Sequence, residues 1–373
     1  MRLETFLPTA DSSLVTAPAA LATMQAAVYK GASQVAIESI PVPDIGRGEL
    51  LIRVESCGIC HTDLKKIEYN LLPAPRVFGH ETAGVVAAMG DGVAPRYKPG
   101  DRVVVFHHIP CGKCFYCSKK LYAQCPVYKK VGVTAGYEPA GGGFSQYVRA
   151  MDWIVDRGIE KIPAGVSFDQ ACFVEPVNTC VKGVKQIDPQ PGDVVAILGQ
   201  GPIGLIFTMI VARSGAQIIA TDTMDSRRKL AHKFGAREAF HPRDTTFERA
   251  VKSMTDGRGA DIVIVAASAP GIVEQAVACS RPGSRVLLFA QTSHQERIEV
   301  SGADICMGER VLCGSYSASV DVQKEAAELV LSGALPVEEL ISHRFPLNNI
   351  HEGIERALHP GAESLKIIVH PQR

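Results

Sequence analysis

The sequence has no excess of charge of either sign. Lysine plus arginine and aspartate plus glutamate both number 39 in 373 residues, so the formal net charge at pH 7 is zero. Nucleic acids and anionic membranes bind basic patches and strongly basic chains, and nothing in this balance predicts such binding. We therefore expect neither a nucleic acid nor a membrane surface among its partners.

Long apolar runs are also missing. The chain has no run of 18 apolar residues that would span a bilayer, and it opens on no charged-then-apolar signal segment. We expect a cytoplasmic protein. Thiols stay reduced in the cytoplasm, so clustered cysteines among the 11 in this chain are explained better by metal binding than by disulfides. Two isolated ones, Cys57 and Cys172, are interpreted as buried apolar side chains.

The length predicts more than one domain, because 373 residues exceed what one ordinary hydrophobic core serves. Residues 1–23 are rich in alanine, threonine, serine and proline and show no clear periodicity. They are interpreted as an N-terminal extension without fixed structure and without assigned function. A regular strand pattern begins at Met24.

Four cysteines gather in a short polar segment, residues 107–126. They are Cys111, Cys114, Cys117 and Cys125. Four thiolates close a tetrahedral shell around Zn²⁺ and leave no open position. An iron–sulfur cluster also takes four cysteines, but the seven-residue last gap, together with the other motifs of the chain, makes it the lesser option. We interpret the segment as a structural zinc lobe, in which the metal replaces a hydrophobic core.

A second metal site is predicted from ligands spread along the chain. Cys60 lies in "CGICHTDL", His80 in "GHETAGVV" and Glu175 in "CFVEPVNTC". Three protein ligands leave one zinc position open for water or substrate, which is the arrangement of a catalytic zinc. Asp63 follows Cys60 closely, and we expect its carboxylate to orient the imidazole of His80.

A glycine motif lies in the middle of the chain. The predicted strand "VVAIL" runs into the motif "GQGPIG", which opens a helix with Phe207 and Ile210 on an apolar face, and the next predicted strand, "QIIATD", ends at Asp222. Between a strand and a helix, and with an acid at this distance, such a motif binds the pyrophosphate of a dinucleotide. The predicted cofactor-binding residues of this loop are Gly199, Gly201, Pro202, Ile203 and Gly204.

Asp222 decides the expected choice of dinucleotide. Its carboxylate can accept hydrogen bonds from the adenosine ribose and would repel a 2′-phosphate, which favours NAD over NADP. Arg227 weakens that preference, because an arginine can accommodate the 2′-phosphate.

Further strands are predicted at residues 261–268, 285–291 and 310–316, with helical stretches between some of them. This alternation predicts a doubly wound parallel sheet. The preceding residues, 24–173, are rich in short strands and turns and are interpreted as a separate β-rich domain.

Together these motifs resemble the zinc-dependent medium-chain alcohol and polyol dehydrogenases, in particular the sorbitol dehydrogenase-like branch. The resemblance runs from about residue 24 to the end and is carried by "CGICHTDL", "GHETAGVV", "PGDRVVV", the four-cysteine lobe, "EP" at 175–176 and "GQGPIG". It implies an α/β protein with a Rossmann domain at 177–317, inserted into a GroES-like β-barrel catalytic domain at 24–176 and 318–373. It also implies a homodimer or homotetramer.

The resemblance assigns roles to single residues. Cys60 and His80 match zinc ligands. Glu81 matches a neighbouring glutamate that can coordinate the metal in the polyol branch, and Glu175 takes the place of the third ligand. Thr62 matches the hydroxyl that takes the substrate proton.

Three more residues follow from the same comparison. His61 and Lys366 fall where the family contacts the pyrophosphate. Lys65 stands where many members have a histidine that completes a proton relay. The proton therefore leaves either through Lys65 or through water.

The implied reaction is hydride transfer to NAD from a secondary alcohol such as a polyol, sugar alcohol or vicinal diol, with one catalytic and one structural Zn²⁺ per chain. A threonine-type amino-alcohol dehydrogenase and a primary-alcohol dehydrogenase are the alternative enzymes. An NAD-binding sensor protein is the alternative outside enzymes.

Overall fold

The computed structural model describes residues 22–107, 109–130, 141–244, 246–290 and 297–373. Nearly all of the predicted N-terminal extension therefore lies outside the described residues. The described residues form two compact units: those within 1–174, 343–359 and 367–373 make the first, and those within 175–342 and 360–366 the second. The predicted domain bounds stay a prediction. Among the described residues, no helix has the length and apolar character needed to cross a membrane.

The first unit is built on antiparallel strands. A three-stranded sheet has the order β2-β1-β4, and a seven-stranded sheet has the order β15-β16-β3-β5-β6-β8, with β7 also paired to β3. The strands of these sheets are β1 (Thr23–Gly31), β2 (Gln34–Pro41), β3 (Leu50–Gly58), β4 (Arg76–Val77), β5 (Glu81–Met89), β6 (Arg102–Val105), β7 (Tyr147–Ala150), β8 (Ile159–Lys161), β15 (Ile341–Pro346) and β16 (Lys366–His370). The predicted β-rich domain is confirmed.

Short helices connect these strands. They are α1 (His61–Glu68), α2 (Phe115–Ser118), α3 (Pro126–Lys130), α4 (Asp152–Arg157), α5 (Phe168–Ala171) and α13 (Ile350–Leu358), with 3₁₀ turns η1 (Tyr122–Gln124) and η5 (Leu347–Asn349).

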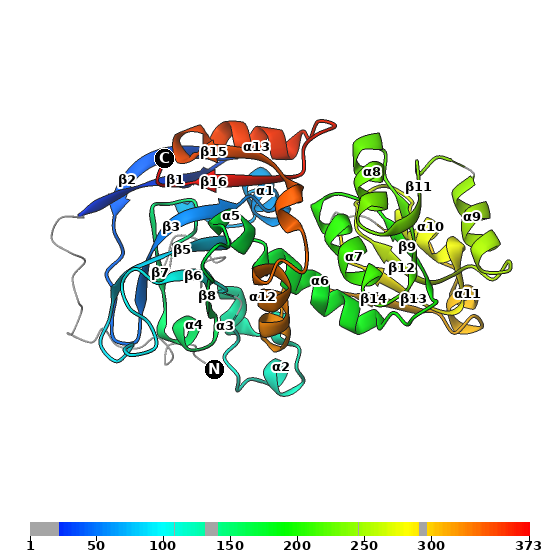
Figure 1. Ribbon diagram of the computed structural model, residues 1–373, viewed down its shortest axis with the longest axis horizontal. Coiled ribbons are helices and arrows are strands. Elements are labelled where there is room, and N and C mark those ends of the chain that lie inside the picture. Colours follow the sequence, from blue (N-terminus) through cyan, green and yellow to red (C-terminus); the bar gives the residue numbers. More distant parts are fainter. Residues whose placement is uncertain (1–21, 108, 131–140, 245, 291–296) are drawn as a thin grey trace. The chain divides into compact units, whose positions relative to one another are not determined.

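The C-terminal strands return to this unit, where β16 pairs antiparallel with β3 (Figure 1). Asp169 on α5 ties the return together. Its carboxylate accepts hydrogen bonds from Ser56 on β3 at 2.6 Å and from Arg344 on β15 at 2.7 Å, and it lies 2.8 Å from Nε2 of His370 on β16. One carboxylate therefore joins three segments that are far apart in the sequence.

The second unit is a six-stranded parallel sheet with the order β11-β10-β9-β12-β13-β14. Its strands are β9 (Val194–Leu198), β10 (Gln217–Thr221), β11 (Ala236–Phe240), β12 (Ala260–Val265), β13 (Ser280–Leu288) and β14 (Val311–Gly314). Its helices are α6 (Val174–Ile187), α7 (Pro202–Ala212), α8 (Asp225–Lys233), α9 (Thr246–Met254), α10 (Ile272–Cys279), α11 (Gly302–Cys306) and α12 (Gln323–Leu331), with 3₁₀ turns η3 (Val320–Val322) and η4 (Val337–Leu340).

Helices cover both faces of this sheet (Figure 1). One core cluster joins alternate residues of β9, among them Val194 and Leu198, to Phe247 of α9 and Ala276 of α10. Helices α7 and α8 pack against β9, β10 and β11. The predicted doubly wound parallel sheet is confirmed.

The helix after the glycine motif differs from the prediction of a single apolar face. Every residue of α7 from Gly204 to Val211 is buried. The stretch is apolar at nearly every position, and a helix that is apolar all round is buried all round. The one-sided apolar pattern was therefore the wrong description of α7.

Candidate active site

Three side chains with metal-binding chemistry meet in the first unit. The Cys60 sulfur, one ring nitrogen of His80 and one carboxylate oxygen of Glu81 all lie within 4.8 Å of one another. The strand register brings them together, because Glu81 at the start of β5 pairs with Gly58 at the end of β3. Two residues beyond Gly58, Cys60 caps α1 and accepts a hydrogen bond from the Thr62 N–H at 3.5 Å.

His80 is held by Asp63, as the sequence predicted. Its Nδ1 lies 3.0 Å from Oδ1 of Asp63, and both side chains are buried. Burial acts to lower the pKa of His80, but the Asp63 carboxylate and the Cys60 thiol outweigh burial and raise it well above its usual value. The site therefore attracts positive charge at its centre.

The donor set fits zinc. A thiolate, an imidazole and a carboxylate are all ligands that Zn²⁺ accepts, and three of them leave a fourth position open. The raised pKa of His80 is consistent with such a site, because the negative groups that stabilise a protonated imidazole there would also stabilise a bound cation. Glu175 lies in the first turn of α6, in the second unit, and its place in the ligand set stays a prediction.

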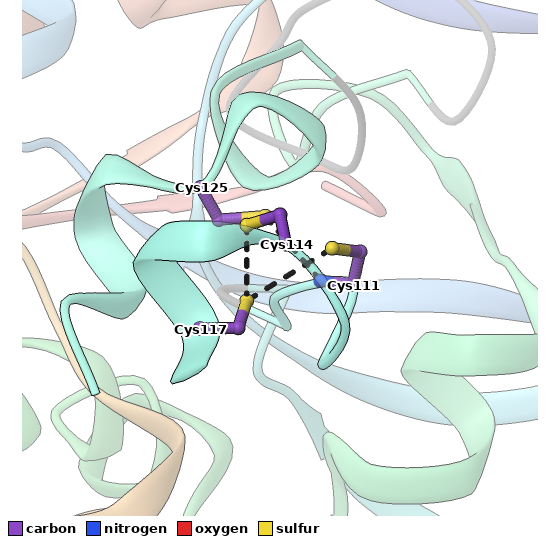
Figure 2. A group of neighbouring side chains, drawn as sticks. All are labelled: Cys111, Cys114, Cys117 and Cys125. Atoms are coloured by element: carbon purple, nitrogen blue, oxygen red, sulfur yellow. Dashed lines mark hydrogen bonds between the residues drawn. The ribbon is translucent and has the colours of Figure 1, made fainter. Parts of the chain in front are cut away.

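The four-cysteine segment forms a second group of ligands. Figure 2 shows the sulfur atoms of Cys111, Cys114, Cys117 and Cys125 turned toward one another. All four lie within 4.8 Å of one another. The Cys114–Cys117 and Cys111–Cys117 sulfur pairs are 3.5 and 3.9 Å apart. Tetrahedral zinc with Zn–S bonds near 2.3 Å sets its sulfurs about 3.8 Å apart.

The local packing of this lobe agrees with a metal at its centre. Its buried cluster consists of Cys117, Cys125 and Tyr128, with Cys111, Cys114 and Tyr122 packed against it. A backbone hydrogen bond at Cys117, followed by contacts with the other thiols, lowers the pKa of Cys114 to about 7. Thiolate is the form that ligates metal.

The glycine motif is shaped for a dinucleotide. Gly199 has a φ of +97°, and a Cβ there would lie 2.5 Å from the Cβ of Ala267; a Cβ on Gly204 would lie 1.9 Å from the Gly199 oxygen. Folding itself therefore requires these two glycines. Gly201 has a φ of −66°, and the nearest atom to its added Cβ is 3.9 Å away. The fold leaves space beside Gly201, where a pyrophosphate would approach the backbone.

Comparisons with known proteins show the family of this chain. The alcohol dehydrogenase GroES-like domain family matches residues 46–164, and the zinc-binding dehydrogenase family matches residues 202–332. Sorbitol dehydrogenase of Bacillus subtilis strain 168 is 31% identical over 94% of this chain and 98% of its own length. L-threonine 3-dehydrogenase of Bacillus licheniformis is 30% identical over 89% of this chain and 95% of its own. The chain belongs to the zinc-dependent medium-chain alcohol dehydrogenase family.

A solved structure supports the fold of this dehydrogenase. The crystal structure of a zinc-binding dehydrogenase from Sinorhizobium meliloti 1021, bound to NADP, superposes with a TM-score of 0.83 at 28% identity. It covers 94% of this chain and 99% of that one. The predicted combination of a GroES-like domain with a Rossmann domain is confirmed, and so is the prediction of an enzyme.

Asp222 lies beside the glycine loop of the dehydrogenase. Its Oδ2 accepts a hydrogen bond from the Gln200 N–H at 2.7 Å, and its Oδ1 accepts one from the Met224 N–H at 2.8 Å. Arg227 is close as well, with Nη1 3.8 Å from Oδ2 of Asp222 and Nη2 donating to the Ser364 carbonyl at 2.9 Å. The two residues that bear on the choice of dinucleotide are thus adjacent.

The remaining predicted residues lie on elements of these two sites. His61 and Thr62 open α1, next to Cys60. Lys65 lies further along α1, and partial burial lowers its pKa against an opposing effect of Glu68. Lys366 is buried at the start of β16, two residues after the Ser364 carbonyl that Arg227 binds. The roles of these residues stay predictions.

The sequence analysis did not single out His107. This side chain is 2% exposed, and its ring centroid lies 5.8 Å from that of His80 in an edge-to-face arrangement. His107 follows β6, which pairs with β5 so that Val105 lies opposite Thr82. The sequence offered one signal for His107, its position just after "PGDRVVV", the segment that contains β6. Because β6 is antiparallel to β5, the end of β6 lies close to the start of β5, and therefore close to His80.

Proposed function

We propose that this enzyme oxidises a secondary alcohol group of a polyol, sugar alcohol or vicinal diol to a ketone with NAD as the acceptor. The observation that carries this proposal is the convergence of Cys60, His80 and Glu81, a ligand set that could hold zinc and that includes a carboxylate. Carboxylate oxygen is a harder ligand than a second thiolate, which suits substrates with several oxygens. The similarity to a sorbitol dehydrogenase supports the same substrate class.

The reaction divides between the cofactors and the chain. When bound, zinc supplies Lewis acidity toward an alcohol oxygen, and the dinucleotide supplies the hydride acceptor. Thr62, two residues after Cys60 in the first turn of α1, takes the hydroxyl proton of the substrate. Lys65 passes it on toward solvent, or water does. Asp63 holds the His80 ring in the orientation that zinc requires.

The proposed resident metals are one zinc at Cys60, His80 and Glu81 or Glu175, and a second zinc at the four cysteines. The second has no open position and serves the lobe rather than the chemistry. A Cys60→Ser enzyme that kept full turnover with both zinc sites occupied would contradict the ligand assignment.

We propose NAD rather than NADP because the Asp222 carboxylate is fixed at the glycine loop by two backbone N–H groups. A 2′-phosphate beside it would meet negative charge. Arg227 acts against this preference for NAD, because its guanidinium lies near Asp222 and can accommodate a 2′-phosphate. His61 and Lys366 are proposed pyrophosphate contacts. In an Asp222→Ala variant, kcat/KM for NADP relative to NAD should rise by about tenfold or more; an unchanged ratio would count against this role of Asp222.

A threonine-type amino-alcohol substrate is the second candidate. The 30% identity to an L-threonine 3-dehydrogenase favours it, and this nearly equals the identity to the sorbitol dehydrogenase. Both substrates are secondary alcohols, so the proposed chemistry is the same.

A substrate panel separates these candidates. Formation of NADH is followed with sugar alcohols, vicinal diols, threonine and primary alcohols, each with and without a zinc chelator. Chelator-sensitive activity on a polyol or diol is the expected result. Activity confined to threonine or to primary alcohols would overturn the substrate class and keep the mechanism. Inactivity on every alcohol with zinc fully loaded would favour an NAD-binding sensor.

We also propose a cytoplasmic location and a homodimeric or homotetrameric assembly. None of the 11 cysteines, all of them among the described residues, forms a disulfide, which supports a reducing compartment. Light scattering on the purified enzyme tests the assembly, and a monomeric mass would contradict it.

A further inference from the structure

Lys182, on α6 in the second unit, directs its ammonium at backbone oxygens. Its Nζ lies 2.7 Å from the carbonyl oxygen of Tyr316 and 3.3 Å from that of Ser317. Partial burial lowers the pKa of Lys182, so the charged form is held there at a desolvation cost. The two hydrogen bonds from the Lys182 ammonium therefore hold the backbone at Tyr316 and Ser317 in place.

Asn178 lies one turn earlier on α6 and forms hydrogen bonds with the same segment. It is fully buried, its Nδ2 donates to the Ser319 carbonyl at 3.0 Å, and its Oδ1 accepts from the Ser319 N–H at 2.8 Å. Residues i and i+4 share one face of a helix. This face of α6 therefore holds residues 316–319 at both ends.

The held segment follows β14, at the carboxyl edge of the parallel sheet. Ligands of doubly wound sheets bind outside this edge, and a dinucleotide extends across both halves of the sheet. Asp222 follows β10, in the half that would take the adenosine ribose. The other half, β12-β13-β14, is therefore where the nicotinamide end would lie.

Helix α6 also contacts the glycine loop. The Cys180 sulfur lies 3.9 Å from the carbonyl oxygen of Ile203 at the start of α7. A Cβ on Gly183 would lie 3.1 Å from Phe207 and 3.2 Å from Leu287, so α6 packs closely on α7 and β13. One rigid helix thus links the pyrophosphate loop to the segment after β14.

Ser315, at the start of that segment, has a buried hydroxyl with no hydrogen-bond partner among the described residues. The side chain is 5% exposed, and its N–H donates to the Leu288 carbonyl at 3.1 Å. Its Oγ makes no hydrogen bond within the described residues. Buried hydroxyls are normally satisfied, so a bound ligand is expected to supply the partner. The carboxamide at the nicotinamide end offers both a donor and an acceptor.

We propose that Lys182 is a positioning residue, which holds the segment Ser315–Ser319 so that the Ser315 hydroxyl binds the carboxamide of the nicotinamide. This inference rests on the proposed function as a nicotinamide-dependent dehydrogenase. It adds a residue distant in sequence from every motif and predicts which end of the cofactor that residue serves.

The test compares NADH with ADP-ribose, which lacks the nicotinamide, by calorimetric titration of the full-length enzyme. In Lys182→Met, the Kd for NADH should rise by about tenfold while the Kd for ADP-ribose stays unchanged. Lys182→Arg should recover most of the NADH affinity, because a guanidinium can still donate to two carbonyls. Lys185→Met is the matched control, since Lys185 is on the same helix and pairs with Glu325 at 2.7 Å on the surface.

Ser315→Ala provides a second variant that should fold normally. Its melting temperature should not fall, because the substitution removes a hydroxyl that has no partner in the part of the chain that the structure describes. Its Kd for NADH should rise, with ADP-ribose binding unchanged. If the wild type prefers the phosphorylated cofactor, NADPH replaces NADH and 2′-phospho-ADP-ribose replaces ADP-ribose in these titrations.

The outcomes separate the inference from the function. The inference fails if the wild type binds NADH no more tightly than ADP-ribose, if Lys182→Met weakens both ligands equally or neither, or if Ser315→Ala leaves NADH binding unchanged. A wild type that binds neither ligand would overturn the proposed function, and this inference with it.

Discussion

The Nδ1 atom of His80 lies 3.0 Å from Oδ1 of Asp63, at a site where both side chains are buried. This hydrogen bond fixes the ring and its tautomer, so Nε2 is the nitrogen that would ligate a metal. It also links α1, which carries Asp63 and is capped by Cys60, to the residue just before β5. The two predicted zinc ligands Cys60 and His80 are therefore oriented by this one buried hydrogen bond.

Asp63→Asn should weaken zinc binding at this site by about 10- to 100-fold, because carboxylates that orient ligating histidines contribute this much to metal affinity. Zinc retained against a competing chelator measures the effect. Asp156→Asn is the control, since Asp156 is exposed on the surface. Equal zinc retention in the two variants would contradict the orienting role of Asp63.

Cys117→Ser should remove one zinc per chain and lower the melting temperature, because the lobe has little core besides its ligands. Metal content and thermal unfolding are measured together. Cys306→Ser replaces an exposed cysteine outside the lobe and should change neither. A Cys117→Ser protein with full zinc content and unchanged melting would show that the lobe is not a metal site.

Two glycine substitutions should behave in opposite ways. Gly201→Ala meets no protein atom closer than 3.9 Å and needs no unusual φ, so stability should be kept while the Kd for the dinucleotide rises by about tenfold or more. Gly204→Ala places its Cβ 1.9 Å from a backbone oxygen and should destabilise the fold by about 1–3 kcal/mol or more. Calorimetry and thermal melting distinguish them. Unaltered dinucleotide binding by Gly201→Ala would contradict the role of the glycine motif in binding the pyrophosphate.

Asp169 should make stability depend on pH in the acid range. Burial acts to raise the pKa of Asp169, but hydrogen bonds from His370, Ser56 and Arg344 outweigh burial and lower it below its usual range. A carboxyl with a lowered folded-state pKa stabilises the fold fully above its unfolded value of about 3.9 and loses that contribution as the pH falls further.

Asp169→Asn should therefore unfold at a lower temperature than the wild type at neutral pH, and this difference should shrink as the pH falls below about 4. Melting curves across this range measure it. A difference that stayed constant with pH would contradict the ionic role of Asp169.

Features set by local sequence were predictable. The lobe is one short loop, so the spacing of Cys111 to Cys125 was enough to predict that its thiols converge. The pairing of Asp63 with His80 followed from its closeness to Cys60 and was confirmed.

Contacts between distant segments could not be read from the sequence. His107 approaches His80 only through the pairing of β6 with β5, and Lys182 reaches Tyr316 across more than a hundred residues. No periodicity encodes such pairs. The burial of α7 on all sides likewise depends on what packs around it.

The most direct test of the account follows activity and zinc content together. The enzyme is stripped of its more weakly held zinc with a chelator and reloaded in steps, and polyol or diol oxidation is measured at each step. The account predicts activity that is absent when the four cysteines alone hold metal and that rises in proportion to occupancy of the Cys60–His80–Glu81 site. Full activity with this site empty would contradict it.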